Sequence, residues 1–219
     1  MSAILEIYIV IAMSIFFMGA YAIGSRRNYK IQKKVWSTLS KELKPFCKSV
    51  KHQGFGSSGF RVGCLPENAP ISKLEVTVTL LAREMPLYYV YSKFKGRHDK
   101  IIIRSNFRKP PKFRIEIQKE WMITKEMQQS LMELEEIKLN GFPKTLKMRA
   151  PEKHQVAKLF SSKALLANLQ RLNGCIERLS IMHEEPQLLL ICALRENLIQ
   201  PLLKLVTQLG EGVKIITGR

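Results

Sequence analysis

The first 24 residues contain the longest apolar stretch of the chain. From Ile7 to Gly24 there is no charged residue, and the stretch extends back to Ala3 if Glu6 lies at the headgroup level. At about 1.5 Å of rise per residue, a helix of about 20 such residues spans the hydrocarbon core of a bilayer. The pattern therefore predicts a transmembrane helix over Ala3–Gly24.

Five basic residues follow this stretch at once: Arg26, Arg27, Lys30, Lys33 and Lys34. Positive residues beside a spanning helix stay in the cytoplasm, so we expect the N-terminus outside and the remaining chain on the cytosolic side. A cleaved signal peptide is an alternative, because Ala20-Tyr21-Ala22 has the small-x-small pattern of a cleavage site. Against it, Met1–Glu6 lacks a basic region and the uncharged run exceeds that of a typical signal peptide. A buried core helix or an interfacial helix would usually have a polar face.

A basic amphipathic helix is predicted next, over Ser25–Val50. Apolar residues recur at helical spacing, whereas the other face is rich in lysine and carries a single acid, Glu42. We expect the apolar stripe to pack onto the following domain and the lysines to contact headgroups. The stripe consists of Val35, Trp36, Leu39, Leu43 and Phe46.

The remaining chain, Lys51–Arg219, alternates between strand and helix patterns. Strands are predicted at 60–64, 73–82, 100–108, 112–118, 145–150, 178–183 and 187–194, and helices at 124–139, 152–160, 162–173 and 197–209. This order predicts an α+β fold with an antiparallel or mixed sheet and flanking helices. The helix-rich segment near Gln118–Gly141 is a point where the domain could divide into two lobes.

One further helix is predicted between the second and third strands. Pro86 suits the first turn of a helix, and Gly96 suits its end. Between them, Leu87, Val90, Tyr91 and Phe94 recur at i, i+3, i+4 and i+7. This spacing gives the helix one apolar face.

Charge is the second informative property of the chain. Its 36 lysines and arginines against 18 acids give a net charge of +18. Two kinds of partner explain such an excess, namely anionic lipid headgroups and the phosphates of nucleic acids. A protein on the cytosolic face of a membrane meets both, and composition does not choose between them.

The densest basic region runs from Arg83 to Lys119, where only Glu84, Asp99 and Glu116 oppose eleven bases. An exposed sheet face is often charged, but mixed signs are then expected. We therefore expect RNA or lipid phosphates to bind here. The candidate phosphate-binding residues are Arg83, Lys93, Lys95, Arg97, Lys100, Arg104, Arg108, Lys109, Lys112 and Arg114.

Motifs for catalysis, cofactors or metals are missing from the sequence. The cysteines and histidines have no ligand-like spacing, so free thiols in a reducing compartment are expected, and neither a metal nor a cofactor is. The chain also lacks a Gly-x-Ser-x-Gly elbow, a Walker loop and a His-Glu-x-x-His motif. An enzyme is therefore the least favoured class, and no small-molecule substrate is expected. The cysteines are Cys47, Cys64, Cys175 and Cys192, and the histidines are His52, His98, His154 and His183.

Several short motifs resemble the calumin family, the coiled-coil-domain subunit of the PAT complex in the multipass translocon of the endoplasmic reticulum. The first is Ile23-Gly24-Ser25-Arg26-Arg27-Asn28 after the anchor, followed by a basic helix containing Trp36. Arg83–Ile103 resembles the family's strand–helix–strand unit with its Asp-x-Ile-x-Ile motif, and Gly141-Phe142-Pro143 resembles a Gly-Leu-Pro break. The closing order of helix, two strands and leucine-rich helix is also similar. This chain lacks the family's acidic lumenal region and its long C-terminal coiled coil.

The resemblance implies a non-catalytic accessory factor for membrane-protein insertion that associates with the Sec translocon and small membrane-protein partners. The ribosome is a further expected partner, although the coiled coil that reaches it in the family is missing. We expect the domain in the cytosol, at the endoplasmic reticulum or, in a prokaryote, at the plasma membrane. A protein that binds anionic lipids at the membrane surface is the alternative function, and a membrane-tethered enzyme is less favoured.

Overall fold

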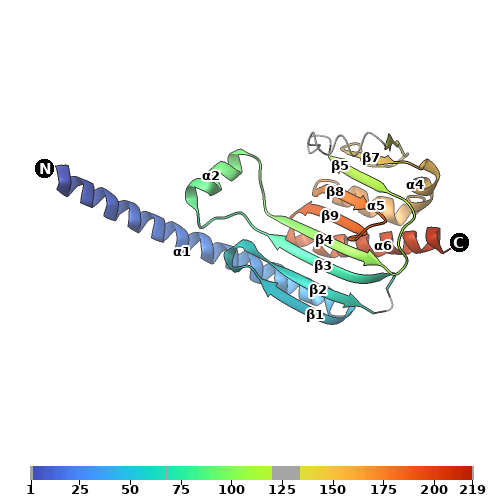
Figure 1. Cartoon of the computed structure of the whole chain (residues 1–219), viewed down its shortest axis with the longest axis horizontal. Helices are drawn as coiled ribbons and strands as arrows, with labels where there is room; N and C mark the ends of the chain where they lie inside the picture. The colour runs from blue at the N-terminus through green and yellow to red at the C-terminus, as the bar shows by residue number, and fades with distance from the viewer. Residues whose placement is uncertain (1, 68, 120–133, 219) are drawn as a thin grey trace.

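The computed structural model describes residues 2–67, 69–119 and 134–218. They form one long N-terminal helix and one nine-stranded sheet with shorter helices (Figure 1). The helices are α1 (Ser2–Leu43), α2 (Pro86–Phe94), α4 (Lys153–Leu159), α5 (Lys163–Leu172) and α6 (Ile199–Thr217), with short 3-10 turns η1 (Gly56–Ser58) and η3 (Glu196–Leu198). The strands are β1 (Cys47–Gly54), β2 (Gly59–Pro66), β3 (Ile71–Thr79), β4 (Lys100–Phe107), β5 (Ile115–Lys119), β6 (Glu135–Glu136), β7 (Leu146–Ala150), β8 (Ile176–Ile181) and β9 (Leu188–Ala193).

The sheet has the strand order β1-β2-β3-β4-β9-β8-β5-β7-β6, and each neighbouring pair is antiparallel. The predicted α+β class is therefore confirmed. The two-lobe division considered near 118–141 falls largely outside the described residues. The strands on its two sides belong to one sheet, because β4 pairs with β9 and β5 pairs with β8.

Helices α1 and α6 cover one face of this sheet, and α5 lies beside α6 (Figure 1). The alternation predicted for β4 is confirmed, since Ile101, Ile103 and Phe107 are buried beneath the helices. The second half of α1 contributes Val35, Leu39 and Leu43 to the same core, also as predicted. Burial of these leucine and valine side chains, each worth about 1.5–3 kcal/mol, locks α1 onto the sheet.

The predicted helix over Ser25–Val50 is wrong in its last residues. The helix ends at Leu43, and β1 begins at Cys47 and pairs with β2. Pro45 explains the break, because it has no N–H to continue the helix and disfavours helical geometry in the residue before it. At its other end the helix has no boundary near Gly24, since α1 is continuous from Ser2.

Two predicted helices near the C-terminal half also differ from the structure. For 124–139, residues 124–133 lie outside the described ranges, and Glu135–Glu136 form β6 against β7 instead of helix. The final helix does not end at Gly210 but continues to Thr217. Gly210 lies against Pro70, where a Cβ would come within 2.8 Å of the Pro70 ring. This close packing compensates for the low helix propensity of glycine.

Candidate functional site

The junction between α1 and the sheet is held by a buried polar network. Asn28, which is fully buried, donates from Nδ2 to the Leu81 carbonyl at 2.9 Å and accepts from Arg83 Nη1 at 2.8 Å. Arg83 also forms a two-bond ion pair with Asp99, at 3.0 Å and 2.6 Å. Asp99 in turn accepts a hydrogen bond from the Leu81 amide at 2.8 Å. The network joins α1, the β3–α2 segment and the start of β4.

Arg83 is therefore a structural residue of this junction. Burial alone would lower the pKa of its guanidinium, but the hydrogen bond and charge of Asp99 raise that pKa above its ordinary value. Only 10% of its side chain is exposed. Arg83 is already paired and is not available to bind a phosphate without breaking the junction.

A close backbone contact lies one helical turn before Asn28. Gly24 packs against the Arg83 carbonyl, and a Cβ at this position would come within 2.5 Å of the Glu84 nitrogen. Glu84 itself accepts a hydrogen bond from Ser57 Oγ at 2.8 Å and one from Asn28 Nδ2 at 3.3 Å. The end of the apolar part of α1 is thus fastened directly to the segment that leads into α2.

Four more of the ten candidate phosphate-binding residues pair with a carboxylate or a backbone carbonyl of the protein. Lys100 Nζ lies 2.7 Å from Glu177, and Arg104 lies 3.1 Å from Glu75. Arg108 donates from Nε to the Ala69 carbonyl at 2.7 Å, and Arg114 lies 3.7 Å from the buried Glu116. The sequence pattern could not identify these partners, because all but Glu116 lie at least 29 residues away.

The other five candidates lie at opposite ends of β4 (Figure 1). Lys93, Lys95 and Arg97 lie at the end of α2 and just after it, before β4 begins, whereas Lys109 and Lys112 lie in the turn after β4. All five are exposed. An eight-residue strand is about 25 Å long, so the predicted patch is divided into two smaller basic groups. We call them the α2 group and the β4–β5 turn group.

The structure also gathers bases that the prediction did not bring together. Lys93, Lys119 and Arg195 line a pocket of about 340 Å³, together with His98 and Glu177. Glu177 is 3% exposed and pairs with both His98 and Lys100. The pairing of β4 with β9 brings Arg195 here from a distant part of the chain, and no local sequence signal indicated it.

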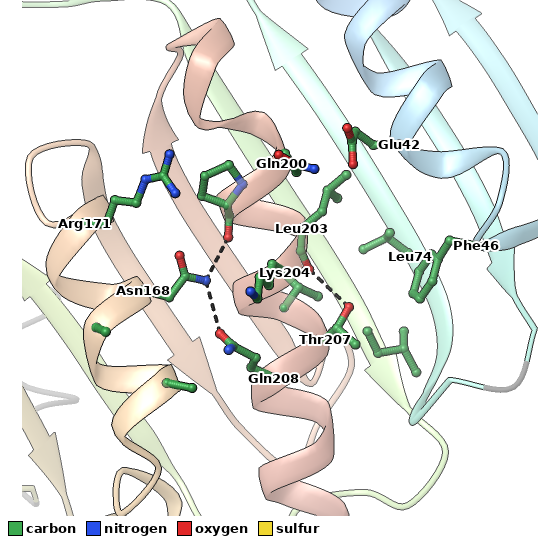
Figure 2. Close-up of a pocket in the computed structure, with 15 residues that line it drawn as sticks. Glu42, Phe46, Leu74, Asn168, Arg171, Gln200, Leu203, Lys204, Thr207 and Gln208 are labelled. Atoms are coloured by element: carbon green, nitrogen blue, oxygen red, sulfur yellow. Dashed lines mark hydrogen bonds between the residues drawn. The ribbon is translucent and has the colours of Figure 1, made fainter.

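A shallow groove runs along α6 between α5 and the end of α1 (Figure 2). Its volume is about 670 Å³. Asn168 donates its amide to the Pro201 carbonyl and to Gln208 Oε1, both at 3.1 Å. Thr207 donates to the Leu203 carbonyl at 3.2 Å. The groove is lined by apolar side chains, amides, a hydroxyl and three charged side chains, Glu42, Arg171 and Lys204, and its described lining contains no paired nucleophile and base.

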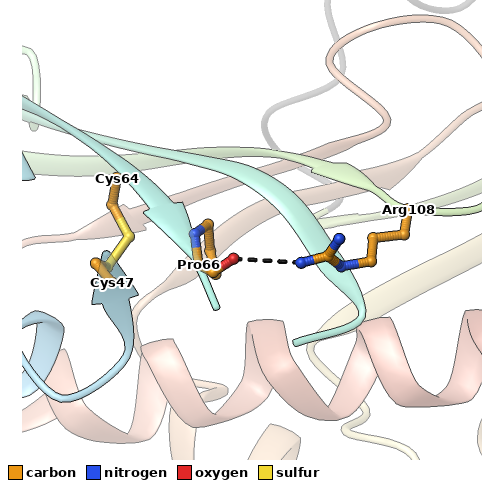
Figure 3. The surroundings of a disulfide bond; sticks show 4 residues. All are labelled: Cys47, Cys64, Pro66 and Arg108. Carbon is orange, nitrogen blue, oxygen red and sulfur yellow. Dashed lines mark hydrogen bonds between the residues drawn. A yellow bond between two sulfur atoms is a disulfide. The ribbon is translucent and has the colours of Figure 1, made fainter. Parts of the chain in front are cut away.

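The expectation of free thiols is wrong for two of the four cysteines. Cys47 and Cys64 form a disulfide between β1 and β2, with Cα atoms 5.7 Å apart (Figure 3). In the same view Arg108 donates to the Pro66 carbonyl at 3.4 Å. The two cysteines are 17 residues apart, and only the pairing of the two strands brings them into contact.

Cys175 and Cys192 are free and buried, as expected for thiols. A hydrogen bond with Cys192 lowers the pKa of the Cys175 thiol, whereas burial raises the pKa of Cys192 well above its ordinary value. Within the described ranges, no three His, Cys, Asp or Glu side chains are close enough together to hold a metal ion.

The five bases predicted to flank a membrane, which we call the juxtamembrane bases, lie on the exposed side of α1. They are Arg26, Arg27, Lys30, Lys33 and Lys34. Lys34 lies 2.7 Å from Glu196 in a surface pair, in which the lysine side chain is 71% exposed. The opposite side of this part of the helix carries the buried Asn28 and Val35.

Comparison with family models and with curated proteins gives no match. Among solved structures, the chain is similar to the crystal structure of the mycobacterial trehalose monomycolate transport factor A, TtfA. The TM-score is 0.47 at 6% identity, over 83% of this chain and 95% of that chain. This score is too low to establish a shared fold.

Proposed function

We propose that this chain is a single-pass membrane protein whose domain is a non-catalytic accessory factor for membrane-protein insertion. The observation that carries the membrane part is α1. This one helix is long and apolar enough to cross a membrane, and its apolar side chains from Ile4 to Ile23 are exposed. An apolar surface of this size is unfavourable in water, and a bilayer would cover it.

The continuity of α1 supports a rigid attachment. The same helix that carries the proposed span buries Val35, Leu39 and Leu43 in the domain core. No linker separates the two, so the domain would keep a fixed distance from the membrane surface. A rigidly held binding domain suits an adaptor that places a partner beside a membrane protein.

The juxtamembrane bases favour a cytosolic domain. The disulfide favours the opposite side, because disulfides persist mainly in oxidising compartments. We give the bases more weight, since flanking charges act during insertion, before β1 and β2 pair and bring Cys47 and Cys64 together. In a reducing compartment the two residues would be adjacent thiols.

Association with the Sec translocon rests on the resemblance to the calumin family. The β4–β5 turn group adds a geometric argument for the ribosome, because Lys109 and Lys112 lie at the end of β4 that is away from the span (Figure 1). They are exposed, at the end of β4 farther from the membrane that α1 would cross (Figure 1). RNA phosphates are anionic ligands that could reach them there.

Membrane extraction tests the anchor. The full chain should resist alkaline carbonate, whereas Ile11→Lys with Ile15→Lys should be released, because two charges in the span cost about 5–7 kcal/mol. Tyr29→Lys with Ser37→Lys is the matched control, since it adds the same charge outside the span. Release of the unaltered chain would contradict the proposal.

Co-sedimentation with ribosomes over a salt series tests the RNA part. Lys109→Gln with Lys112→Gln should reduce the slope of log affinity against log salt concentration by about 1–2. The reason is that binding with two fewer phosphate contacts releases fewer counterions. Lys163→Gln with Lys204→Gln removes the same charge elsewhere and should leave the slope unchanged. If the unaltered chain does not sediment with ribosomes at the lowest salt, ribosome binding is wrong. Crosslinking from the exposed Lys109 to a translocon subunit in native membranes would test the translocon association independently.

A further inference from the structure

The apolar face of α2 points away from the protein. Leu87 is 74% exposed and Phe94 is 87% exposed, and Val90 and Tyr91 between them are half exposed. The buried residue of this helix is instead the small polar Ser92. Side chains with the spacing of a core-facing stripe therefore lie on the outside.

This helix lies directly beside the proposed span. Phe17, Met18 and Tyr21 of α1 line an apolar groove of about 720 Å³ together with Met85 and Leu87. Figure 1 shows α2 standing out from the sheet next to α1, apart from the other helices. The groove thus continues the lipid-facing surface of α1 onto α2.

The depth of α2 relative to the span is set by the junction. Gly24 packs against the Arg83 backbone, and Asn28 binds Leu81 and Glu84. Both contacts hold the start of α2 level with the last turns of the apolar stretch. That stretch ends where the bases Arg26 and Arg27 begin, which is the depth of the headgroups.

The charges around α2 match a lipid surface. The α2 group, Lys93, Lys95 and Arg97, is exposed at the end of the helix and just after it. Tyr88 and Tyr91 add aromatic rings that favour the membrane interface. An apolar face combined with flanking bases is the pattern of helices that lie in the interface plane.

We propose that α2 is a second membrane contact, with its apolar face in the boundary between headgroups and acyl chains and the α2 group on anionic lipid phosphates. The proposal rests on the proposed span of α1. Anchor and α2 would together hold the domain at two points, which fixes its rotation about α1 as well as its distance from the bilayer.

Site-specific lipid quenching tests this contact in the full chain. A fluorophore is attached at Leu87→Cys or Phe94→Cys before reconstitution into vesicles that contain anionic and spin-labelled lipids. The purified chain is labelled under oxidising conditions, so that Cys47 and Cys64 are disulfide-bonded and do not compete for the label, and Cys175 and Cys192 are buried. Phe16→Cys, within the span, is the positive control, and Lys163→Cys, exposed on α5, is the negative control.

Strong quenching at Leu87 and Phe94, close to that at Phe16, is expected, with none at Lys163. Quenching at Phe16 alone would overturn the α2 contact and leave the anchor intact, and a protein partner would then be the occupant of the apolar face. Absence of quenching at all four positions would overturn the anchor and the α2 contact together.

The role of the charges is tested with vesicles of anionic or neutral lipid. Removing the α2 group with Lys93→Gln, Lys95→Gln and Arg97→Gln should reduce quenching at Leu87 in anionic vesicles and have no effect in neutral ones. Lys109→Gln with Lys112→Gln, in the distant β4–β5 turn group, should change neither. Equal quenching before and after removal of the α2 group in anionic vesicles would overturn the phosphate contact.

Discussion

Arg83 and Asp99 form an ion pair through two hydrogen bonds, from Nη1 to Oδ1 at 3.0 Å and from Nη2 to Oδ2 at 2.6 Å. The pair is partly shielded from water, with the two side chains 10% and 16% exposed. Arg83 also donates to Asn28 on α1. This ion pair therefore links helix α1, the segment before α2 and the residue that precedes β4.

Asp99→Asn should lower the free energy of unfolding by about 3 kcal/mol, because it leaves a shielded guanidinium without its counter-charge. Glu196→Gln is the control. It removes the partner of Lys34 in an exposed pair, which should cost less than about 1 kcal/mol. Urea denaturation of the detergent-solubilised chain measures both. Equal losses for the two variants would contradict the structural role of Asp99.

The stability supplied by Arg83 should not depend on pH between 6 and 9. Burial alone would lower its pKa, but the hydrogen bond and charge of Asp99 raise that pKa above its ordinary value. A base with a raised pKa contributes stability that is present below its unfolded pKa and is lost only as the pH rises through its folded pKa. The difference in unfolding free energy between the unaltered chain and Arg83→Gln should therefore be the same at both pH values. A difference that falls by half at pH 9 would show that Arg83 is not held in this way.

Gly24→Ala should separate α1 from the segment that leads into α2. The new Cβ would meet the Arg83 backbone, which cannot move aside as a flexible side chain can. Hydrogen exchange of the amides in Leu81–Met85 should increase. Gly19→Ala is the matched control and should leave this exchange unchanged, because Gly19 lies in the same helix and an added Cβ there has nothing within 4 Å. Protection at Leu81–Met85 that stays unchanged in Gly24→Ala would refute the contact.

Two helical leucines should respond differently to truncation. Leu39→Ala, at a fully buried position, should cost about 2–5 kcal/mol of unfolding free energy. Leu87→Ala, at an exposed position, should cost less than about 0.5 kcal/mol. Denaturation in detergent measures both. A large loss for Leu87→Ala would mean that α2 packs into the domain after all.

The denatured chain should present two reactive thiols before reduction and four afterwards, because Cys47 and Cys64 are bonded and Cys175 and Cys192 are free. Quenching intact cells with acid, which traps each thiol in its cellular state, and then alkylating in denaturant reports the compartment, because Cys175 and Cys192 are buried in the folded chain. Four reactive thiols there would agree with a reducing, cytosolic location, and two would place the domain on the oxidising side. Cys64→Ser in the oxidised protein should lower the unfolding free energy by about 2–4 kcal/mol.

Much of the secondary structure could be predicted, because it depends on residues close together in the chain. The alternation of Ile101 and Ile103 and the end of α2 near Gly96 could be predicted from local periodicity and backbone preference alone. Local reasoning was wrong where a tertiary contact outweighed it. Gly210 looked like a helix end, but its packing against Pro70 holds it inside α6.

The candidate site could be predicted only in part. The sequence identified a basic region but not the acids that pair with its bases. Lys100, for example, pairs with Glu177, which lies 77 residues away in the chain. It also identified the apolar stripe of α2 without indicating that the stripe lies outside. Periodicity shows that a helix has an apolar face, and only the position of the helix in the fold shows what that face meets.

The sequence by itself determined a long apolar helix, the bases that follow it, an α+β order and a strongly positive chain. Each of these is a property of neighbouring residues or of composition. The tertiary structure alone decided which bases are paired, which cysteines are joined, and that α2 lies beside the proposed span with its apolar face uncovered. These depend on contacts between distant segments, and such contacts are set by the packing of the whole sheet.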